Sequence, residues 1–139
     1  GKETLASFDT NDVEAIPDQY WDFIQSLSTH FLVDHYIMVH AGLNFKAINP
    51  LGDSVNMRWA RRWYDLIDYS WLGERIILHG HTKVAQSTIE DMVGNLDKNR
   101  YLDIDNGCYS NNLGQGQLCA FNLDTRELIF QKNVEPSFM

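Results

Sequence analysis

Apolar side chains recur every three or four residues in two segments of the chain. The first segment follows Pro17 and carries Tyr20, Trp21, Ile24, Leu27 and Phe31. The second segment, residues 54–72, has Asp53 or Ser54 as a possible N-cap and carries Met57, Ala60, Trp63, Tyr64 and Ile67. This spacing places the apolar residues of each segment on one helix face, so the pattern predicts two amphipathic helices.

Strand signals lie between and after these helices. Residues 31–39 have the apolar density of two short strands separated by Asp34 and His35, and residues 75–78 form another apolar run. Residues 86–93 fit a strand and a short helix equally well. Three more strands are predicted at 100–108, 116–124 and 127–134, the last two joined by a hairpin turn. We therefore expect an α/β or α+β fold, with helices packed on a mixed β-sheet that ends in a β-meander.

Composition narrows the class of protein. A chain of 139 residues with 44% hydrophobic residues suits one globular domain. Its net charge of -8 disfavours a nonspecific nucleic-acid binder, which needs a basic surface. No apolar run approaches the roughly 18 residues of a membrane span, so we expect a soluble, cytoplasmic protein with no membrane partner. Cys108 and Cys119 lack the spacing of a metal or disulfide framework.

Two histidines occupy similar places in the predicted strands. His40 and His81 each follow an apolar run and each lies beside a glycine. If the two strands are parallel neighbours, both imidazoles reach one edge of the sheet and could bind one metal ion. The alternative is that both histidines are satisfied by backbone carbonyls, and the residues alone leave the two interpretations equal. His79 is expected to have a structural role, because Gly80 interrupts the strand that would place it beside His81.

Other polar groups could also carry chemistry. Arginine binds phosphate through its planar fork, and residues 58–62 contain three arginines, of which one could lie at a cleft. Asp103, Asp105 and Asn106 offer oxygen ligands. Cys108 follows a predicted Asn-Gly turn and could be a nucleophile, although its neighbours supply no cation to lower its pKa.

Taken in order, several segments resemble the C-terminal half of calcineurin-like metallophosphoesterases. Within that superfamily the bacterial relatives of serine/threonine phosphoprotein phosphatases are the most similar. The matching segments are GKETLASF at 1–8, YIMVHAGLN at 36–44, MRWARRW at 57–63, ILHGHT at 77–82 and LDIDNGC at 102–108. The final GQLCAFNLDTRELIF is similar to that family's closing strands.

The resemblance implies an αββα sandwich with a dinuclear centre of two divalent ions, Mn, Fe or Zn, at the strand ends. A metal-bound hydroxide would attack phosphorus. His40 and His81 match two ligands of the second metal, and Arg61 matches the arginine that contacts phosphate. His79 matches no ligand position, and we expect His79 and Asn44 to lie beside the ligands or towards the substrate. The expected substrate is a phosphoprotein or a small phosphate ester, with the loop 45–55 influencing the choice.

The family's GD.H, GD..DRG and GNH motifs do not occur in these residues. We therefore expect residues 1–139 to be a partial domain, the C-terminal part of a longer phosphoesterase, and to be inactive alone. A half-sandwich would also expose sheet surface and could self-associate. Two alternatives stay open. One is a nucleotide hydrolase of the same superfamily, resembling diadenosine tetraphosphate hydrolases, and the other is a non-catalytic binding or regulatory module.

Overall fold

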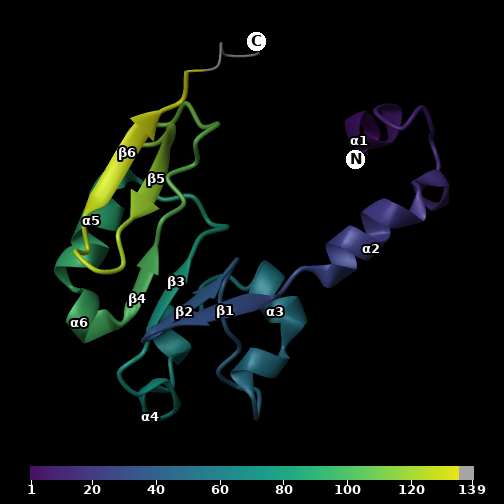
Figure 1. The fold of residues 1–139 in the computed structure, drawn as a ribbon. Helices are drawn as coiled ribbons and strands as arrows, with labels where there is room; N and C mark the ends of the chain where they lie inside the picture. The colour runs from purple at the N-terminus through teal and green to yellow at the C-terminus, as the bar shows by residue number, and fades with distance from the viewer. Residues whose placement is uncertain (135–139) are drawn as a thin grey trace.

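The computed structural model describes residues 1–134, which form a compact body and an N-terminal arm (Figure 1). The body contains a four-stranded mixed sheet in the order β1-β2-β3-β4. Its strands are β1 (His30–Val33), β2 (Tyr36–Val39), β3 (Ile76–His79) and β4 (Tyr101–Asp103). β1 is antiparallel to β2, whereas β2, β3 and β4 are mutually parallel neighbours. The protein is therefore a mixed α and β fold, as the hydrophobic pattern predicts.

The C-terminal strands differ from the predicted meander. β5 (Gln117–Phe121) and β6 (Leu128–Lys132) form a separate antiparallel hairpin. β4 pairs with β3 and not with β5, because α5 (Gln86–Gly94) and α6 (Leu96–Asn99) carry the chain back and allow a parallel crossover. The segment that fitted a strand or a helix is thus helical. Its Ile89 is fully buried against the sheet.

The two faces of the sheet are covered by different elements. Alternate side chains of a strand point to opposite faces, so Ile76 and Leu78 face one layer and Ile77 the other. The first layer contains α5, α6 and the hairpin. The second contains η2 (Pro50–Gly52), α3 (Ser54–Trp59), η3 (Tyr64–Leu66) and α4 (Tyr69–Leu72). The core therefore lies on both sides of the three parallel strands.

The second predicted helix is broken into three short pieces. α3 ends at Trp59, Ala60 adopts an extended ψ of 137°, and Arg62 has a positive φ of 54°. This break lets the indole of Trp63 pack directly on Gly42, where a Cβ atom would lie 2.0 Å from the ring. Trp63 Nε1 also donates to the Ala41 carbonyl at 3.1 Å. The chain therefore forms the contact between Trp63 and Gly42 in place of one continuous helix over residues 54–72.

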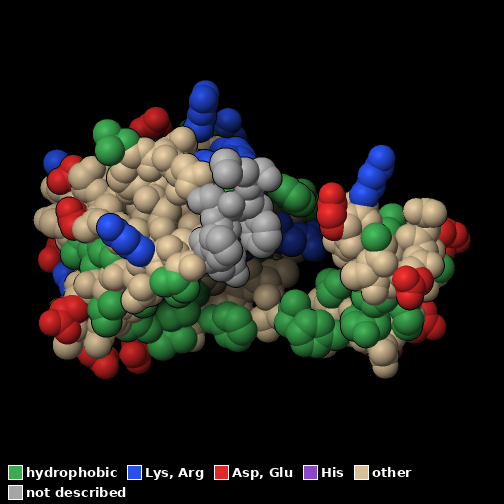
Figure 2. All heavy atoms as spheres, turned by 90° about the horizontal axis from the view of Figure 1, so that it is seen from above, with side chains coloured by type: hydrophobic (Ala, Val, Ile, Leu, Met, Phe, Trp, Pro, Cys, Tyr) green, Lys and Arg blue, Asp and Glu red, His purple; other side chains and the backbone are tan. Residues whose placement is uncertain are grey.

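The arm consists of residues 1–29 and lies apart from the sheet (Figure 1). It contains α1 (Lys2–Ala6), η1 (Val13–Ala15) and α2 (Asp18–Ser26). α2 is the first predicted helix, but it ends at Ser26, and Phe31 belongs to β1 because it pairs with Met38. Figure 2 shows hydrophobic side chains along one side of the molecule from the body to the arm. Within residues 1–134, no helix has both the length and the hydrophobicity needed to cross a bilayer.

Candidate functional site

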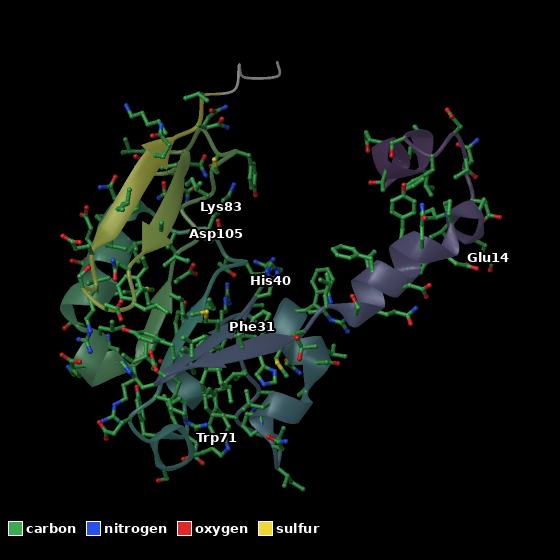
Figure 3. The ribbon with its side chains drawn as sticks, viewed as in Figure 1. Glu14, Phe31, His40, Trp71, Lys83 and Asp105 are labelled. Atoms are coloured by element: carbon green, nitrogen blue, oxygen red, sulfur yellow. The ribbon has the colours of Figure 1, made fainter. Side chains whose placement is uncertain are left out.

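The carboxyl ends of β2 and β3 place His40 and His81 side by side. His40 follows β2 directly, and His81 lies two residues beyond β3. Because the strands are parallel neighbours, both ends meet at one edge of the sheet. The ladder continues past the strands, since the Gly80 N–H donates to the His40 carbonyl at 2.9 Å. Figure 3 shows His40 and Asp105 at this end of the sheet.

One ring nitrogen of each imidazole lies close to a ring nitrogen of the other. His40 Nε2 lies 3.0 Å from His81 Nδ1, and the ring planes meet at 65°. Two nitrogens bound to one zinc ion at about 2.0–2.1 Å lie roughly 2.9–3.4 Å apart, so this separation suits two ligands of one metal ion. It also suits a hydrogen bond between the rings. His81 Nε2, by contrast, is buried and has no hydrogen-bond partner.

The pair does not form a complete metal site within residues 1–134. No group of three or more His, Cys, Asp or Glu side chains in that range is arranged to hold an ion. A structural or catalytic zinc site has at least three protein ligands. The two histidines thus fit a metal as part of a ligand set, and any further ligands would have to come from elsewhere.

His81 is held in an unusual backbone conformation. Its φ is 74°, a region that residues with a Cβ atom seldom adopt. Burial, the Arg61 guanidinium and His40 lower the pKa of His81, which favours the neutral imidazole. Non-glycine residues in this region cost about 1–3 kcal/mol and cluster at functional sites. The strained backbone therefore marks His81 as a functional candidate.

His79 is a buried structural residue. Its Nδ1 lies 3.0 Å from the Gly80 carbonyl, and its Nε2 lies 2.9 Å from the Tyr64 hydroxyl. Burial lowers the pKa of His79 to about 4, so the ring is neutral near pH 7. A carbonyl only accepts hydrogen bonds, so Nδ1 carries the proton and the Tyr64 hydroxyl donates to Nε2. Both ring nitrogens are therefore occupied.

Arg61 lies beside the histidine pair. Its Nη1 donates to Thr82 Oγ1 at 3.3 Å, an exposed contact next to His81. Trp59, the last residue of α3, is 67% exposed and meets the His81 ring edge to face at 5.8 Å. A cation and an open aromatic surface thus lie next to the imidazoles.

Asp105 is a further polar group at this edge of the sheet. Its carboxylate raises the pKa of His81, so the two groups are close, although burial is the larger effect and lowers that pKa. Asp105 Oδ1 accepts from the Gly107 N–H at 2.8 Å, which fixes the turn after β4. In the sequence Asp105 was a candidate only as an oxygen ligand in the strand predicted at 100–108, and the structure adds that this strand is parallel to β3. The next residue, Asn106, bonds three backbone groups and has a structural role.

Asn44 lies at the base of the 45–53 loop. Its Nδ2 donates to Asp53 Oδ2 at 2.9 Å, and its Oδ1 accepts from the Lys46 N–H at 3.1 Å. The hydrogen bond from Asn44, followed by those from Asn56, lowers the pKa of Asp53. Asp53 in turn caps α3 by accepting from the Asn56 N–H. Asn44 thereby connects the end of β2 to the helix that precedes Arg61.

An open groove of about 570 Å³ adjoins the histidine pair. Its lining is mainly apolar, and His40, His81 and Asp105 also line it. Its apolar residues are Phe31, Met38, Val39, Leu78, Ile104, Leu118 and Cys119. The groove has the composition of a surface that receives an apolar group.

Comparison with protein-family models, curated proteins and solved structures gives no match for this chain. The chemistry of His40, His81 and Arg61 is therefore the basis on which a function can be proposed.

Proposed function

We propose that this chain supplies part of the active site of a metal-dependent phosphoesterase that hydrolyses phosphomonoesters. In the proposal His40 and His81 are ligands of one divalent ion, and Arg61 contacts the phosphoryl oxygens. The observation that supports it most directly is the 3.0 Å separation of His40 Nε2 and His81 Nδ1. Imidazole suits zinc and iron, and manganese becomes suitable where carboxylate or amide oxygens join the ligand set.

The chain's own residues would perform distinct tasks at this centre. A divalent ion supplies Lewis acidity to a phosphoryl oxygen and to the attacking water. The Arg61 guanidinium would bind phosphoryl oxygens through its planar fork and stabilise the charge of the transferring group. Its present bond to Thr82 is exposed and 3.3 Å long, so exchanging it for a phosphate contact costs little. His79, fixed by Tyr64, would keep the end of β3 rigid beneath His81.

The proposal requires ligands beyond the described residues, since His40 and His81 have no third protein ligand there. Residues 1–139 by themselves should bind a metal ion weakly and hydrolyse an aryl phosphate at a negligible rate. Substantial metal-dependent turnover by these residues alone would contradict this account of the site.

Cobalt titration tests the metal site without relying on activity. Co²⁺ bound by nitrogen ligands gives visible absorption, and we expect a one-ion signal that weakens about 10–100-fold in affinity in His40→Ala and in His81→Ala. His35→Ala is the matched control, because His35 lies in the turn between β1 and β2 and packs on Tyr36. Equal cobalt affinity in the wild type and the His40→Ala/His81→Ala double variant would refute the proposed ligands.

A nucleotide hydrolase is the second candidate, and Trp59 favours it. A tryptophan that is 67% exposed and lies beside His81 could stack on a nucleobase. Stacking of a base on an aromatic side chain contributes about 1–3 kcal/mol. For the metal-loaded chain we expect Trp59→Ala to weaken adenosine monophosphate binding and to leave inorganic phosphate binding unchanged, whereas Arg61→Ala weakens both. Equal loss or no loss for the two ligands in Trp59→Ala would exclude a base-stacking role.

A further inference from the structure

The apolar stripe of α2 is exposed in the described structure, and its one aromatic contact joins Tyr20 to Phe8 within the arm. Three residues at positions i, i+3 and i+4 form one face of this helix, and all are exposed: Tyr20 43%, Phe23 63% and Ile24 54%. Leu27, the C-cap residue that follows, is 55% exposed. No residue of α1 or α2 is buried. A helix of nine residues is marginal in water unless its apolar face packs on something. The arm therefore carries a docking face.

The arm and the body are joined by the chain and by little else. Within residues 1–134, every hydrogen bond made by residues 1–28 stays inside that segment. Phe8 packs against Tyr20, which also lies within the arm. Because no polar contact holds the arm at its present angle, it is free to dock elsewhere.

The groove beside the histidine pair lies next to the point where the arm joins the body. Ser28, Thr29 and His30, at the root of the arm, line the same groove as Leu118. Its neighbouring strand β1 is also exposed, with Phe31 60% and Leu32 58% accessible. From this root α2 runs away from the sheet (Figure 1), so the helix could lie in the groove of its own chain only if the chain reversed its direction at the root.

The arm is acidic, and the body carries a cation beside the histidine pair. Residues 1–29 contain six carboxylates and one lysine. The body carries arginines around the end of α3 and a lysine after Thr82: Arg58, Arg61, Arg62 and Lys83. In Figure 2 Lys and Arg side chains lie beside the gap that separates the body from the arm. Arg61 of this group lies next to His81, which lines the groove, so an acidic helix in the groove would have a cation beside it.

We propose that two copies of this chain exchange their arms, so that α2 of one copy lies in the groove of the other. A two-fold axis near the roots of the arms makes both contacts at once, and this arrangement closes as a dimer. The exchange buries the stripe of α2 and the groove together, and it places the acidic arm beside Arg61. It does not depend on metal binding, so it stands or falls separately from the phosphoesterase proposal.

Sedimentation velocity on the full chain tests the exchange. We expect a dimer for the wild type and a weaker dimer for Phe23→Asp in the arm and for Leu118→Lys in the groove. Each substitution occurs twice per dimer, so the dissociation constant should rise at least about tenfold. Both side chains are exposed, at 63% for each, so the fold of the single chain should survive. Ile48→Asp and Ile48→Lys are matched controls at a fully exposed loop position and should stay dimeric.

Mixing the two variants separates arm exchange from other dimers. In a mixed dimer one arm and one groove are both unaltered, and the other contact pairs Asp with Lys. We therefore expect the mixture to associate more tightly than either variant alone, and high salt to weaken the wild-type dimer. A monomeric wild type at about 100 μM would overturn the proposal. The proposal would also be overturned if Phe23→Asp left the dissociation constant unchanged, or if the mixture associated no more tightly than either variant alone.

Discussion

The arm and the body have similar amphipathic patterns but different surroundings. In the body Ile77 of β3 is fully buried, whereas in the arm Phe23 of α2 is 63% exposed. The sequence pattern defines the apolar face of each element, and only the rest of the molecule supplies what covers it. We therefore expect substitutions in the body to change the free energy of unfolding and substitutions in the arm to change dimerisation. Four predictions, on the stability of the single chain at concentrations too low for association, test this division.

The largest effect is expected at the centre of the sheet. Ile77→Ala removes buried methyl groups between β2, β4 and the layer of α3 and α4. We expect a loss of about 2–5 kcal/mol in the free energy of unfolding, measured by urea denaturation followed by circular dichroism. A loss below about 0.5 kcal/mol, the range typical of surface sites, would mean that the sheet is not the core of the cooperative unit.

The pH dependence of body stability should depend on Asp103. Burial raises the pKa of its carboxyl to about 7, and Oδ2 is buried without a hydrogen-bond partner. His79, Asp105 and Cys119 lie around it. An unfolded aspartate titrates near pH 4, so the folded state binds the proton more tightly. Stability contributed by the protonated form is therefore complete below about pH 4 and is lost as the pH rises to about 7, by on the order of 3–4 kcal/mol.

The matched variant for this effect is Asp103→Asn. Asparagine keeps the oxygen that accepts from the Asp105 N–H and cannot ionise. Urea denaturation at several pH values should therefore show a flatter profile between about pH 4 and 7 than in the wild type. Parallel profiles for the two proteins would show that Asp103 does not titrate in this range.

A smaller loss is expected from Tyr64→Phe. The hydroxyl donates to His79 Nε2, and its removal leaves that nitrogen buried and unpaired, at a cost of about 1–3 kcal/mol. Tyr69→Phe is the control, since its hydroxyl bonds the Asn99 carbonyl at an exposed site and should change stability by under about 0.5 kcal/mol. Thermal unfolding of both variants measures the difference. Equal losses would contradict a stabilising buried hydrogen bond between Tyr64 and His79.

The smallest effect is expected in the arm. Phe23→Ser should change the unfolding free energy of the dilute chain by less than about 0.5 kcal/mol, because Phe23 has no buried contact. Hydrogen exchange measured by mass spectrometry should also show fast exchange in α2 and slow exchange in β2 and β3. Protection of α2 as strong as that of β3 at this dilution would remove the distinction between arm and body.

Much of the fold follows from local patterns. The apolar runs predict β2 and β3 correctly, because continuous apolar residues suit strands covered on both faces. Helical periodicity fails at residues 54–72, since contact of Trp63 with Gly42 lies outside any local pattern. The pairing of β4 with β3 was equally inaccessible, because the alternation of Leu102 with Asp103 specifies a strand and not its neighbour.

The location of the candidate site could also be predicted from the sequence, but its detailed geometry could not. Histidines at the ends of two apolar runs suggest one location once the strands are taken as parallel neighbours, and His40 and His81 do meet. The sequence gives no sign that His81 has a positive φ or that its Nε2 is buried without a partner. These features depend on how the chain turns after Gly80.

The contact between Trp63 and Gly42 also gives the protein an optical probe. Trp63 is 4% exposed and lies 5.0 Å from the His79 ring, whereas Trp59 is open to water beside His81. An indole in an apolar setting emits at shorter wavelength than one in water, so Trp63 and Trp59 should have different emission maxima. Ligand arrival at the histidine pair would perturb the long-wavelength component, and melting of the core would shift the short-wavelength one. In a variant with Trp21 and Trp71 replaced by phenylalanine, ligand binding and unfolding can thus be followed separately in one unlabelled sample.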